Sequence, residues 1–326
     1  MMKIKRVKAI LSSFVIASML FSNSAFAASA FNTQSSKEKA ISNLINAGWT
    51  MNEINDFLND EELLKYSDCG KIVSETHYVR IEHQAQNSNS DGENAISGDK
   101  KNIETDCAVN LTKDEFFKEV NEKKSEKAAA KATLSSYDDG SDDHTTSDGY
   151  LRYTLSASYG GNSAYSLSLR YQWYITPGTR ATDVIGLGHG DALTQTTSAT
   201  NVYNVFKADY AEYPGSTGTL ENSGKKVIAD NGGTAISFDL PANYASDAYT
   251  VTYSNFRGYM RYDAVITYPT MANQSCGIYG IYKHQALGVK FNPSIGYPSG
   301  GTLSVSPSLN YVAETPNAYF AIRMNY

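Results

Sequence analysis

Apolar and polar side chains alternate with a period of two along the carboxyl-terminal half of the chain. In residues 150–159, leucine, tyrosine and alanine alternate with arginine, threonine and serine, and the same rhythm returns in residues 165–175. The glycine-rich sequence of residues 160–162 separates the two runs. Because side chains of a strand point alternately to its two faces, these runs predict two half-buried strands joined as a β-hairpin.

Later segments repeat this pattern between turns rich in glycine, proline and asparagine. They cover residues 234–240, 248–254, 258–268, 277–291, 301–312 and 318–326. About eight strands with no convincing helix between them predict a mainly β fold. We therefore expect residues 148–326 to form a Tyr/Gly/Ser-rich antiparallel domain, either a β-sandwich or a barrel-like sheet pair.

The chain before residue 135 shows the helical period instead. Apolar residues recur at helical spacing before Gly48, and Thr50 stands three residues before Glu53 in a capping-box pattern. A second pair, Thr112 and Glu115, precedes a charged helix that ends near residue 130. Residues 71–83 are rich in β-branched side chains and predict a strand. Residues 28–134 are thus expected to be a charged, α-rich segment with one or two strands, followed by a polar linker at 135–147.

Composition changes at the same place. Residues 28–149 hold 13 Lys+Arg and 24 Asp+Glu, whereas residues 150–326 hold 11 and 10. Of the 24 tyrosines, 21 lie at or after Tyr150. A charged segment therefore gives way to a neutral, aromatic one, which supports the predicted boundary.

The amino terminus predicts a secretory signal peptide. Four cations precede an apolar run at residues 9–21, and Ala25-Phe26-Ala27 supplies the small residues of a cleavage site, with a second choice after Ala30. Cleavage after Ala27 predicts a secreted or extracellular protein, which could also associate with the cell surface. The alternative is an anchor that is not cleaved. No later stretch has the length of a membrane-spanning helix. Removing the four cations from the formal charge of −6 leaves about −10, which argues against nucleic acid as a partner.

The segment 176–191 carries the most suggestive chemistry. It contains Arg180, Asp183, His189 and Asp191 among several glycines, directly after a predicted strand. In a loop, His189 and Asp191 can orient each other for acid–base chemistry, as an extracellular hydrolase requires. The simpler interpretation is a sharp reversal of the chain that Arg180 and Asp183 hold together. Neither a metal-ligand set nor a cofactor motif is recognisable.

Tyrosine and cysteine give two further hypotheses. Tyr253, Tyr259, Tyr262 and Tyr268 lie along one segment, and exposed rings of this kind suit the binding of a cell-envelope glycan or a protein. The alternative is that tyrosine simply occupies strands with one face exposed to solvent.

Cys69 and Cys107 share the amino-terminal segment and are candidates for one disulfide, which would leave Cys276 alone.

Two stretches resemble a group of exported proteins of uncharacterised function from spore-forming Gram-positive bacteria. They are GWTMNEINDFLNDEELLKYSD and YQWYITPGTRATDVIGLGHG. The resemblance implies export and a layout of helices followed by strands, and it assigns no residue a role.

The leading functional hypothesis is a secreted or cell-envelope-associated binding protein that uses an aromatic sheet surface. A hydrolase centred on the segment from Arg180 to Asp191 is the alternative. An outer-membrane β-barrel is a second alternative, because apolar side chains alternate toward the aromatic terminal Tyr326. Residues 28–130 are also candidates for a propeptide or docking module.

Overall fold

The structure is a computed structural model. It describes residues 24–86, 103–133, 148–178, 180, 182–198, 201–222, 226–230, 232–246, 248–285, 294–296, 304–306, 312–315 and 318–324. The predicted linker at 135–147 lies outside these residues, as does the predicted signal peptide except for its last four residues.

The described helices are α1 (Ser24–Asn46), α2 (Met51–Phe57), α3 (Asp60–Leu64) and α4 (Lys113–Thr133). Two helices, α2 and α4, begin where the capping boxes predict them. At the start of α2, Thr50 Oγ1 accepts from Glu53 N at 3.2 Å, and Glu53 Oε2 accepts from Thr50 N at 2.8 Å. The same two hydrogen bonds join Thr112 and Glu115 ahead of α4. Both boxes satisfy amide groups that have no partner inside the helix.

The strands form two open antiparallel sheets. Sheet A runs in the order β2-β1-β3-β4-β12-β7-β8, with β6 and β11 also paired to β12. Its strands are β1 (Ile72–Gln86), β2 (Ile103–Leu111), β3 (Gly149–Gly161), β4 (Ala164–Ile175), β6 (Leu193–Gln195), β7 (Tyr203–Tyr213), β8 (Thr217–Asn222), β11 (Tyr244–Ala245) and β12 (Thr250–Ile266). Of the two architectures that the strand pattern predicts, the sandwich is the one observed.

Sheet B runs in the order β16-β13-β5-β10-β9, with β17 also paired to β13. Its strands are β5 (Thr182–His189), β9 (Lys226–Asp230), β10 (Gly233–Asp239), β13 (Ser275–Gln285), β16 (Val312–Glu314) and β17 (Ala318–Arg323). A short separate pair consists of β14 (Ser294–Gly296) and β15 (Ser304–Ser306).

The compositional boundary does not separate two units in space. Strand β1, from the charged segment, pairs with β3 from Ile72 opposite Ser158 to Ile81 opposite Gly149. Strand β2 then extends the same sheet beyond β1. The charged segment therefore contributes two strands to sheet A as well as the helices that cover it.

The core lies between the two sheets, and the inward side chains of the β3–β4 hairpin form part of it. Leu151, Tyr153 and Leu155 are fully buried, as are Leu167 and Leu169 across the hairpin. Sheet B meets them with the inward residues of β5, β10 and β13, and Phe206 of sheet A stacks on Phe238 of sheet B with ring centroids 4.3 Å apart. The predicted alternation therefore identifies the inward face correctly, but the expectation of half-buried strands is wrong for β3, because Thr154, Ser156 and Ser158 on its opposite face are buried as well.

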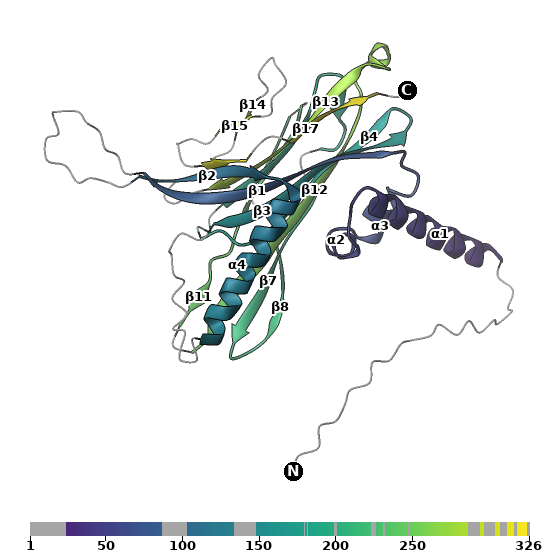
Figure 1. The fold of residues 1–326 in the computed structure, drawn as a ribbon. Coiled ribbons are helices and arrows are strands. Elements are labelled where there is room, and N and C mark those ends of the chain that lie inside the picture. The colour runs from purple at the N-terminus through teal and green to yellow at the C-terminus, as the bar shows by residue number, and fades with distance from the viewer. Residues whose placement is uncertain are drawn as a thin grey trace, which may run out of the picture.

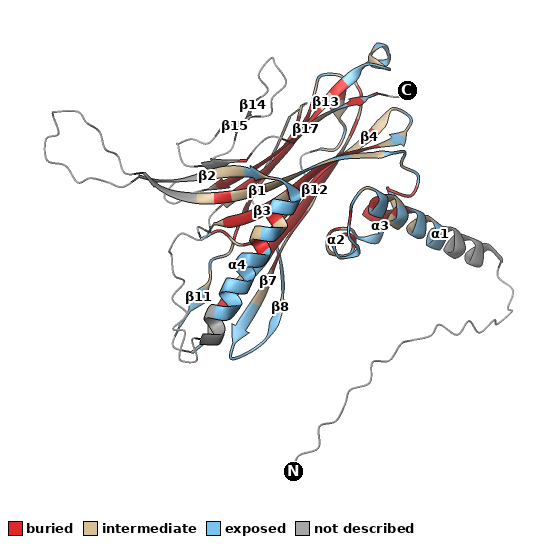
Figure 2. Ribbon diagram, viewed as in Figure 1, coloured by how far each residue is buried: buried red, intermediate tan, exposed pale blue. Residues whose placement is uncertain are grey.

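Helices form a third layer on the outer face of sheet A (Figure 1). Trp49, Phe57 and Tyr66 from α1–α3 and their connections pack around Tyr259, while Phe116 and Val120 of α4 pack on Tyr150. Figure 2 shows the buried residues concentrated in the strands, with exposed residues along the outer side of α4. The sheet that carries these helices is therefore covered on both faces over most of its width.

Gly258 of β12 leaves room for the aromatic rings of its two cross-strand neighbours in sheet A, Tyr171 of β4 and Phe206 of β7. A Cβ there would lie 2.5 Å from Tyr171 Cε1 and 2.6 Å from Phe206 Cδ1. We expect Gly258→Ala to lower the free energy of unfolding by about 1–3 kcal/mol through overpacking. Gly160→Ala is the control, because the nearest atom to its Cβ is Ala164 O at 3.8 Å. Equal midpoints in urea denaturation for the two variants would contradict this interpretation.

The predicted disulfide is wrong. All three cysteines are free. Cys69 precedes β1, whereas Cys107 lies opposite Glu82, ten residues beyond the start of that strand. At the rise of an extended chain this separation is about 33 Å, far more than a disulfide spans.

Among the described residues, no helix combines the length and apolar character needed to cross a membrane.

Candidate functional site

The segment predicted as a functional loop is largely a central strand. Residues 182–189 form β5 between β13 and β10 in sheet B. Asp183 and His189 both point into the sandwich, because inward residues recur at every second position with Ile185 and Leu187. Gly186 and Gly188 therefore belong to a buried strand, which periodicity in so short a run does not reveal.

Asp183 belongs to a buried polar network between the sheets. Its side chain is 0% exposed; Oδ1 lies 2.8 Å from His284 Nδ1, and Oδ2 accepts a hydrogen bond from the Tyr282 hydroxyl. Trp173 Nε1 donates to the same hydroxyl at 2.8 Å. Burial raises the pKa of Tyr282 well above its ordinary value, with the carboxylate of Asp183 adding to the effect, so the hydroxyl keeps its proton. This network joins the sheets and has no access to solvent.

The other three residues of the predicted catalytic set do not converge on Asp183. His189 is 2% exposed and its Nδ1 lies 3.0 Å from Gly190 O, whereas Asp191 is exposed. Arg180 donates to Asn243 and lies over the Phe256 ring, with 5.7 Å between its Cζ and the ring centroid. Arg180 and Asp183 therefore make separate contacts. Among the described residues, no group of three His, Cys, Asp or Glu is placed to hold a metal ion.

The four tyrosines predicted as a binding surface do not form one. Tyr259 and Tyr262 are 0% exposed. The Tyr259 hydroxyl lies 2.7 Å from that of Tyr66 beneath the helices, and Tyr262 donates to Leu187 O at 3.2 Å between the sheets. Tyr253 is partly buried against the core, and Tyr268 alone of the four is exposed. Tyr259 and Tyr262 are three residues apart along β12 and therefore point to opposite faces of sheet A. The register shift between Ser254 and Arg257 places Tyr253 on the face of Tyr262 instead of that of Tyr259.

Other tyrosines are exposed at one end of sheet A. Tyr213 closes β7 and is 80% exposed, while Tyr244 and Tyr249 flank the β11–β12 turn with ring centroids 5.5 Å apart. Register places Tyr213 opposite Thr250 and Tyr244 opposite Val251, so Tyr213 and Tyr244 point to opposite faces. These three residues do not share one flat platform.

Arginines line the outer face of sheet A beneath the helices. They come from three adjacent strands and are Arg152, Arg170, Arg257 and Arg261. Arg170, Arg257 and Arg261 are 5%, 7% and 3% exposed. Buried cations require carboxylate partners, and the short helices α2 and α3 supply them.

Glu53 is the central partner of this arginine row. Its Oε1 accepts from Arg152 Nη2 at 2.7 Å and from Arg170 Nε at 3.1 Å. Burial raises the pKa of Glu53, but the charges of Arg170 and Arg152 and the hydrogen bonds from Thr50 outweigh it, so the net pKa lies below the ordinary value. The second contact of Arg170 is with the Trp49 ring, 4.4 Å from its centroid.

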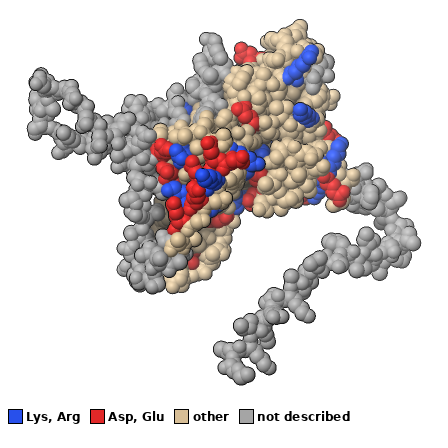
Figure 3. Space-filling model, viewed as in Figure 1, with Lys and Arg blue, Asp and Glu red and all other residues tan. Residues whose placement is uncertain are grey.

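The other two acids extend the pairing along β12. Asp56 Oδ2 accepts from Arg257 Nε at 2.7 Å, and Glu62 Oε2 accepts from Arg261 Nη1 at 2.8 Å. In the face shown in Figure 3, charged side chains of both signs are mixed over the helical layer, whereas neutral side chains cover most of the remaining described surface. The acids of α2 and α3 thus fasten those helices to sheet A.

A polar cavity of about 680 Å³ opens beside this contact, between α3 and the end of sheet A. Asn59, Glu61, Glu62 and Lys65 line it from the helix side. The other walls combine the β6–β7 connection with β12 and consist of Thr196, Thr197, Ser198, Asn201, Tyr203, Arg261 and Asp263. Its volume falls within the range of about 300–1,000 Å³ typical of small-molecule sites.

Hydrogen bonds hold the walls of this cavity in place. Arg261 Nη2 donates to Ser166 Oγ at 2.9 Å and also to Asp263. Asp263 N donates to Thr197 Oγ1 at 2.9 Å, and Thr196 Oγ1 donates to Asp263 O at 3.0 Å. On the opposite side Tyr203 donates to Phe57 O at 2.7 Å, which ties β7 to the end of α2. The cavity is therefore a built site whose walls come from three distant parts of the sequence.

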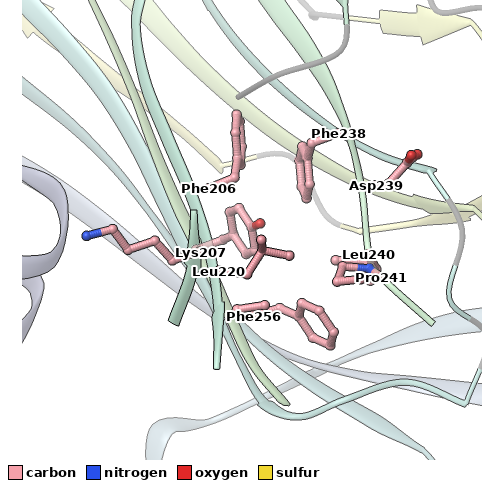
Figure 4. A pocket seen from close by; sticks show the side chains of 10 residues that line it. Phe206, Lys207, Leu220, Phe238, Asp239, Leu240, Pro241 and Phe256 are labelled. Atoms are coloured by element: carbon pink, nitrogen blue, oxygen red, sulfur yellow. The ribbon is translucent and has the colours of Figure 1, made fainter. Parts of the chain in front are cut away.

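An apolar cavity between β7, β8 and β10 is much smaller (Figure 4). Phe206, Phe238 and Phe256 project around it, with Leu220 and Pro241 beside them. Its volume is about 10 Å³, which is room for about one water molecule. It is a packing irregularity rather than a ligand site.

Comparisons with known proteins do not place the chain in a family. No protein-family model matches it. No curated protein matches it. A solved structure described as "pH-induced modulation of Streptococcus parasanguinis adhesion by Fap1 fimbriae" is 10% identical, with a TM-score of 0.24, over 53% of this chain and 80% of that chain. Similarity at that level carries no argument about fold or function, so the functional conclusion rests on the site itself.

Proposed function

We propose that this protein is an exported, non-catalytic binding protein that takes a saccharide of the cell envelope in the cavity between α3 and sheet A. The observation that carries the proposal is the cavity itself, about 680 Å³ in volume and lined by polar side chains on every wall. Two expectations from the sequence support the setting: the signal peptide and the resemblance to exported proteins. The proposed binding site is therefore a polar cavity and not the aromatic sheet face that the sequence predicts.

The ligand class follows from the charges of the lining. The two cations, Lys65 and Arg261, already pair with Glu62, and Arg261 pairs with Asp263 as well. An anionic ligand would have to displace those carboxylates. The remaining side chains are mostly hydroxyls and amides, which both donate and accept hydrogen bonds. Sugar hydroxyls have the same dual capacity, and the Tyr203 ring adds an apolar surface.

Binding is favoured over cleavage because two of the three carboxylates that line the cavity are engaged with Arg261. Glycoside hydrolysis requires one carboxyl group that gives up a proton and a second that acts as base or nucleophile. Glu62 and Asp263 each accept hydrogen bonds from the Arg261 guanidinium, so Glu61 is the lining carboxylate that this arginine does not engage. The described lining therefore does not offer the pair of unengaged carboxyl groups that hydrolysis requires.

Calorimetric titration with two neutral tetrasaccharides, chitotetraose and maltotetraose, tests the proposal. We expect saturable binding of at least one of them, weakened roughly threefold to tenfold by Asn201→Ala, because one hydrogen bond to the ligand is worth about 0.5–1.5 kcal/mol. Asn201 is exposed, so the substitution leaves the core intact.

Asn121→Ala on α4 is the matched control and is expected to bind like the unchanged protein. Absence of binding to both sugars, or an equal loss in the two variants, would contradict the proposed site. Mass spectrometry of the protein from culture supernatant tests the export component separately, with cleavage after Ala27 as the expected result.

A further inference from the structure

A second cavity lies at one end of the sandwich, where the two sheets part. It has a volume of about 260 Å³. Its walls come from the start of β1, the β3–β4 hairpin and the end of β17, so it opens between sheet A and sheet B. The lining residues that matter for its chemistry are Lys71, Ala157, Tyr159, Tyr165, Ile322 and Arg323.

The rim of this end cavity is positively charged. Lys71 and Arg323 are both exposed, and no described residue that lines the cavity is acidic. No ion pair joins either cation to a described carboxylate; Asp68, the nearest acid along the chain to Lys71, pairs with Lys39 at 3.0 Å. In a chain with a formal charge of −6, two cations facing one acid-free cavity form a local site for an anion.

The interior of the end cavity is mostly apolar, with Ser158 as a buried polar side chain in its lining. Ala157, Tyr165 and Ile322 belong to the inter-sheet core and are 3%, 3% and 7% exposed. Tyr159 leans on Tyr165 with ring centroids 5.2 Å apart. A ligand that enters here leaves water for an apolar surface while its head stays between the two cations at the rim.

We propose that the end cavity binds an anionic amphiphile, a carboxylate or phosphate carried on a short apolar body. This site is separate from the saccharide cavity. The two differ in chemistry, because here the cations have no carboxylate partners and the walls are mostly apolar, whereas in the saccharide cavity the cations are paired and the walls are polar. The cavity is small, so the apolar body is a short chain or a single ring rather than a long acyl chain.

Titration of the full chain with sodium octanoate and octyl phosphate tests this proposal, with octyl glucoside as the neutral probe. We expect saturable binding of at least one anionic probe, and at least tenfold weaker binding of octyl glucoside. If just one of the two anionic probes binds, the result supports the site and identifies the preferred head group. Binding of neither, or equal binding of the neutral probe, overturns the proposal.

Two variants locate the binding. Lys71→Gln/Arg323→Gln is expected to weaken the anionic probe at least tenfold, and Ala321→Trp, at an exposed position of the cavity wall, is expected to block it. Lys127→Gln on α4 and Ala211→Trp on β7 are the matched controls, both at exposed positions. Unchanged affinity in both cavity variants would overturn the assignment. Titration of the same variants with chitotetraose is expected to give unchanged affinity, because the saccharide site lies elsewhere. Failure of the end cavity can therefore be told apart from failure of the saccharide site.

Discussion

Replacing Glu53 by glutamine is expected to lower the free energy of unfolding by about 3–5 kcal/mol, because it leaves Arg170 buried without its carboxylate partner. Glu53 accepts from both Arg170 and Arg152, and Arg170 is only 5% exposed. Glutamine retains the shape of the side chain and its ability to cap α2, so the loss isolates the charge. Urea denaturation of the two proteins measures it.

The chain supplies its own control in the second capping box. Glu115 occupies the same position ahead of α4 as Glu53 does ahead of α2, but it faces solvent and has no arginine partner among the described residues. We expect Glu115→Gln to cost a small fraction of the Glu53→Gln loss. Equal losses would show that capping, rather than the buried ion pairs, holds the helices.

The charge of Glu53 makes the stability loss of Glu53→Gln depend on pH. The pKa of Glu53 is lowered from an ordinary value of 4.5 in the folded protein. A carboxylate with a lowered pKa stabilises the fold fully above its unfolded pKa, and the contribution is lost as the pH falls through the folded value. The difference in midpoint between the unchanged protein and Glu53→Gln is therefore expected to be constant above about pH 5.5 and to shrink below pH 4.5. A difference that grew on acidification would contradict the assignment.

Replacing Asp183 by alanine is expected to produce the second large loss, again about 3–5 kcal/mol. The substitution removes the acceptor of hydrogen bonds from Tyr282 and His284 in a site that water does not reach. Groups left without partners in such a site carry their full desolvation cost. Thermal or urea denaturation measures the loss.

Asp191→Ala is the comparison for this second prediction. Asp191 comes from the same stretch of sequence but is exposed, so its replacement is expected to change stability within about 0.5 kcal/mol. Similar stabilities for the two variants would mean that the buried network contributes little. A large loss for Asp183→Ala alone would show that this segment stabilises the fold through the buried network.

Local signals in the sequence predict local structure well. The capping boxes at Thr50 and Thr112 and the glycine turn after β3 depend on residues close together in the chain, and each appears in the fold as expected. Period-two alternation also predicts the buried face of the β3–β4 hairpin, because that face meets one continuous core.

Long-range pairing explains what the sequence did not reveal. Arg170 stands on the polar side of an alternating strand and would normally face water, yet Glu53, 117 residues earlier, covers it. Tyr259 is buried for a similar reason, since Trp49 and Phe57 reach it from the amino-terminal helices. The residues that cover Arg170 and Tyr259 are far away in the sequence, so the alternation within one strand cannot predict these contacts.

The saccharide cavity was missed for a related reason. Its walls bring Asn59, Asn201 and Asp263 together from α3, the β6–β7 connection and β12. Each is a common polar residue at an unremarkable position, so composition and spacing give no signal. Only the pairing of β6 with β12, and the docking of α3 beside them, assembles the site.

Hydrogen–deuterium exchange with and without chitotetraose is the most direct test of the proposed saccharide site. We predict slower exchange in peptides around Asn59–Lys65, Thr197 and Asp263, the three walls of the saccharide cavity. Protection confined to peptides containing Tyr213, Tyr244 and Tyr249, with none at the cavity, would contradict that assignment and place recognition at the exposed end of sheet A.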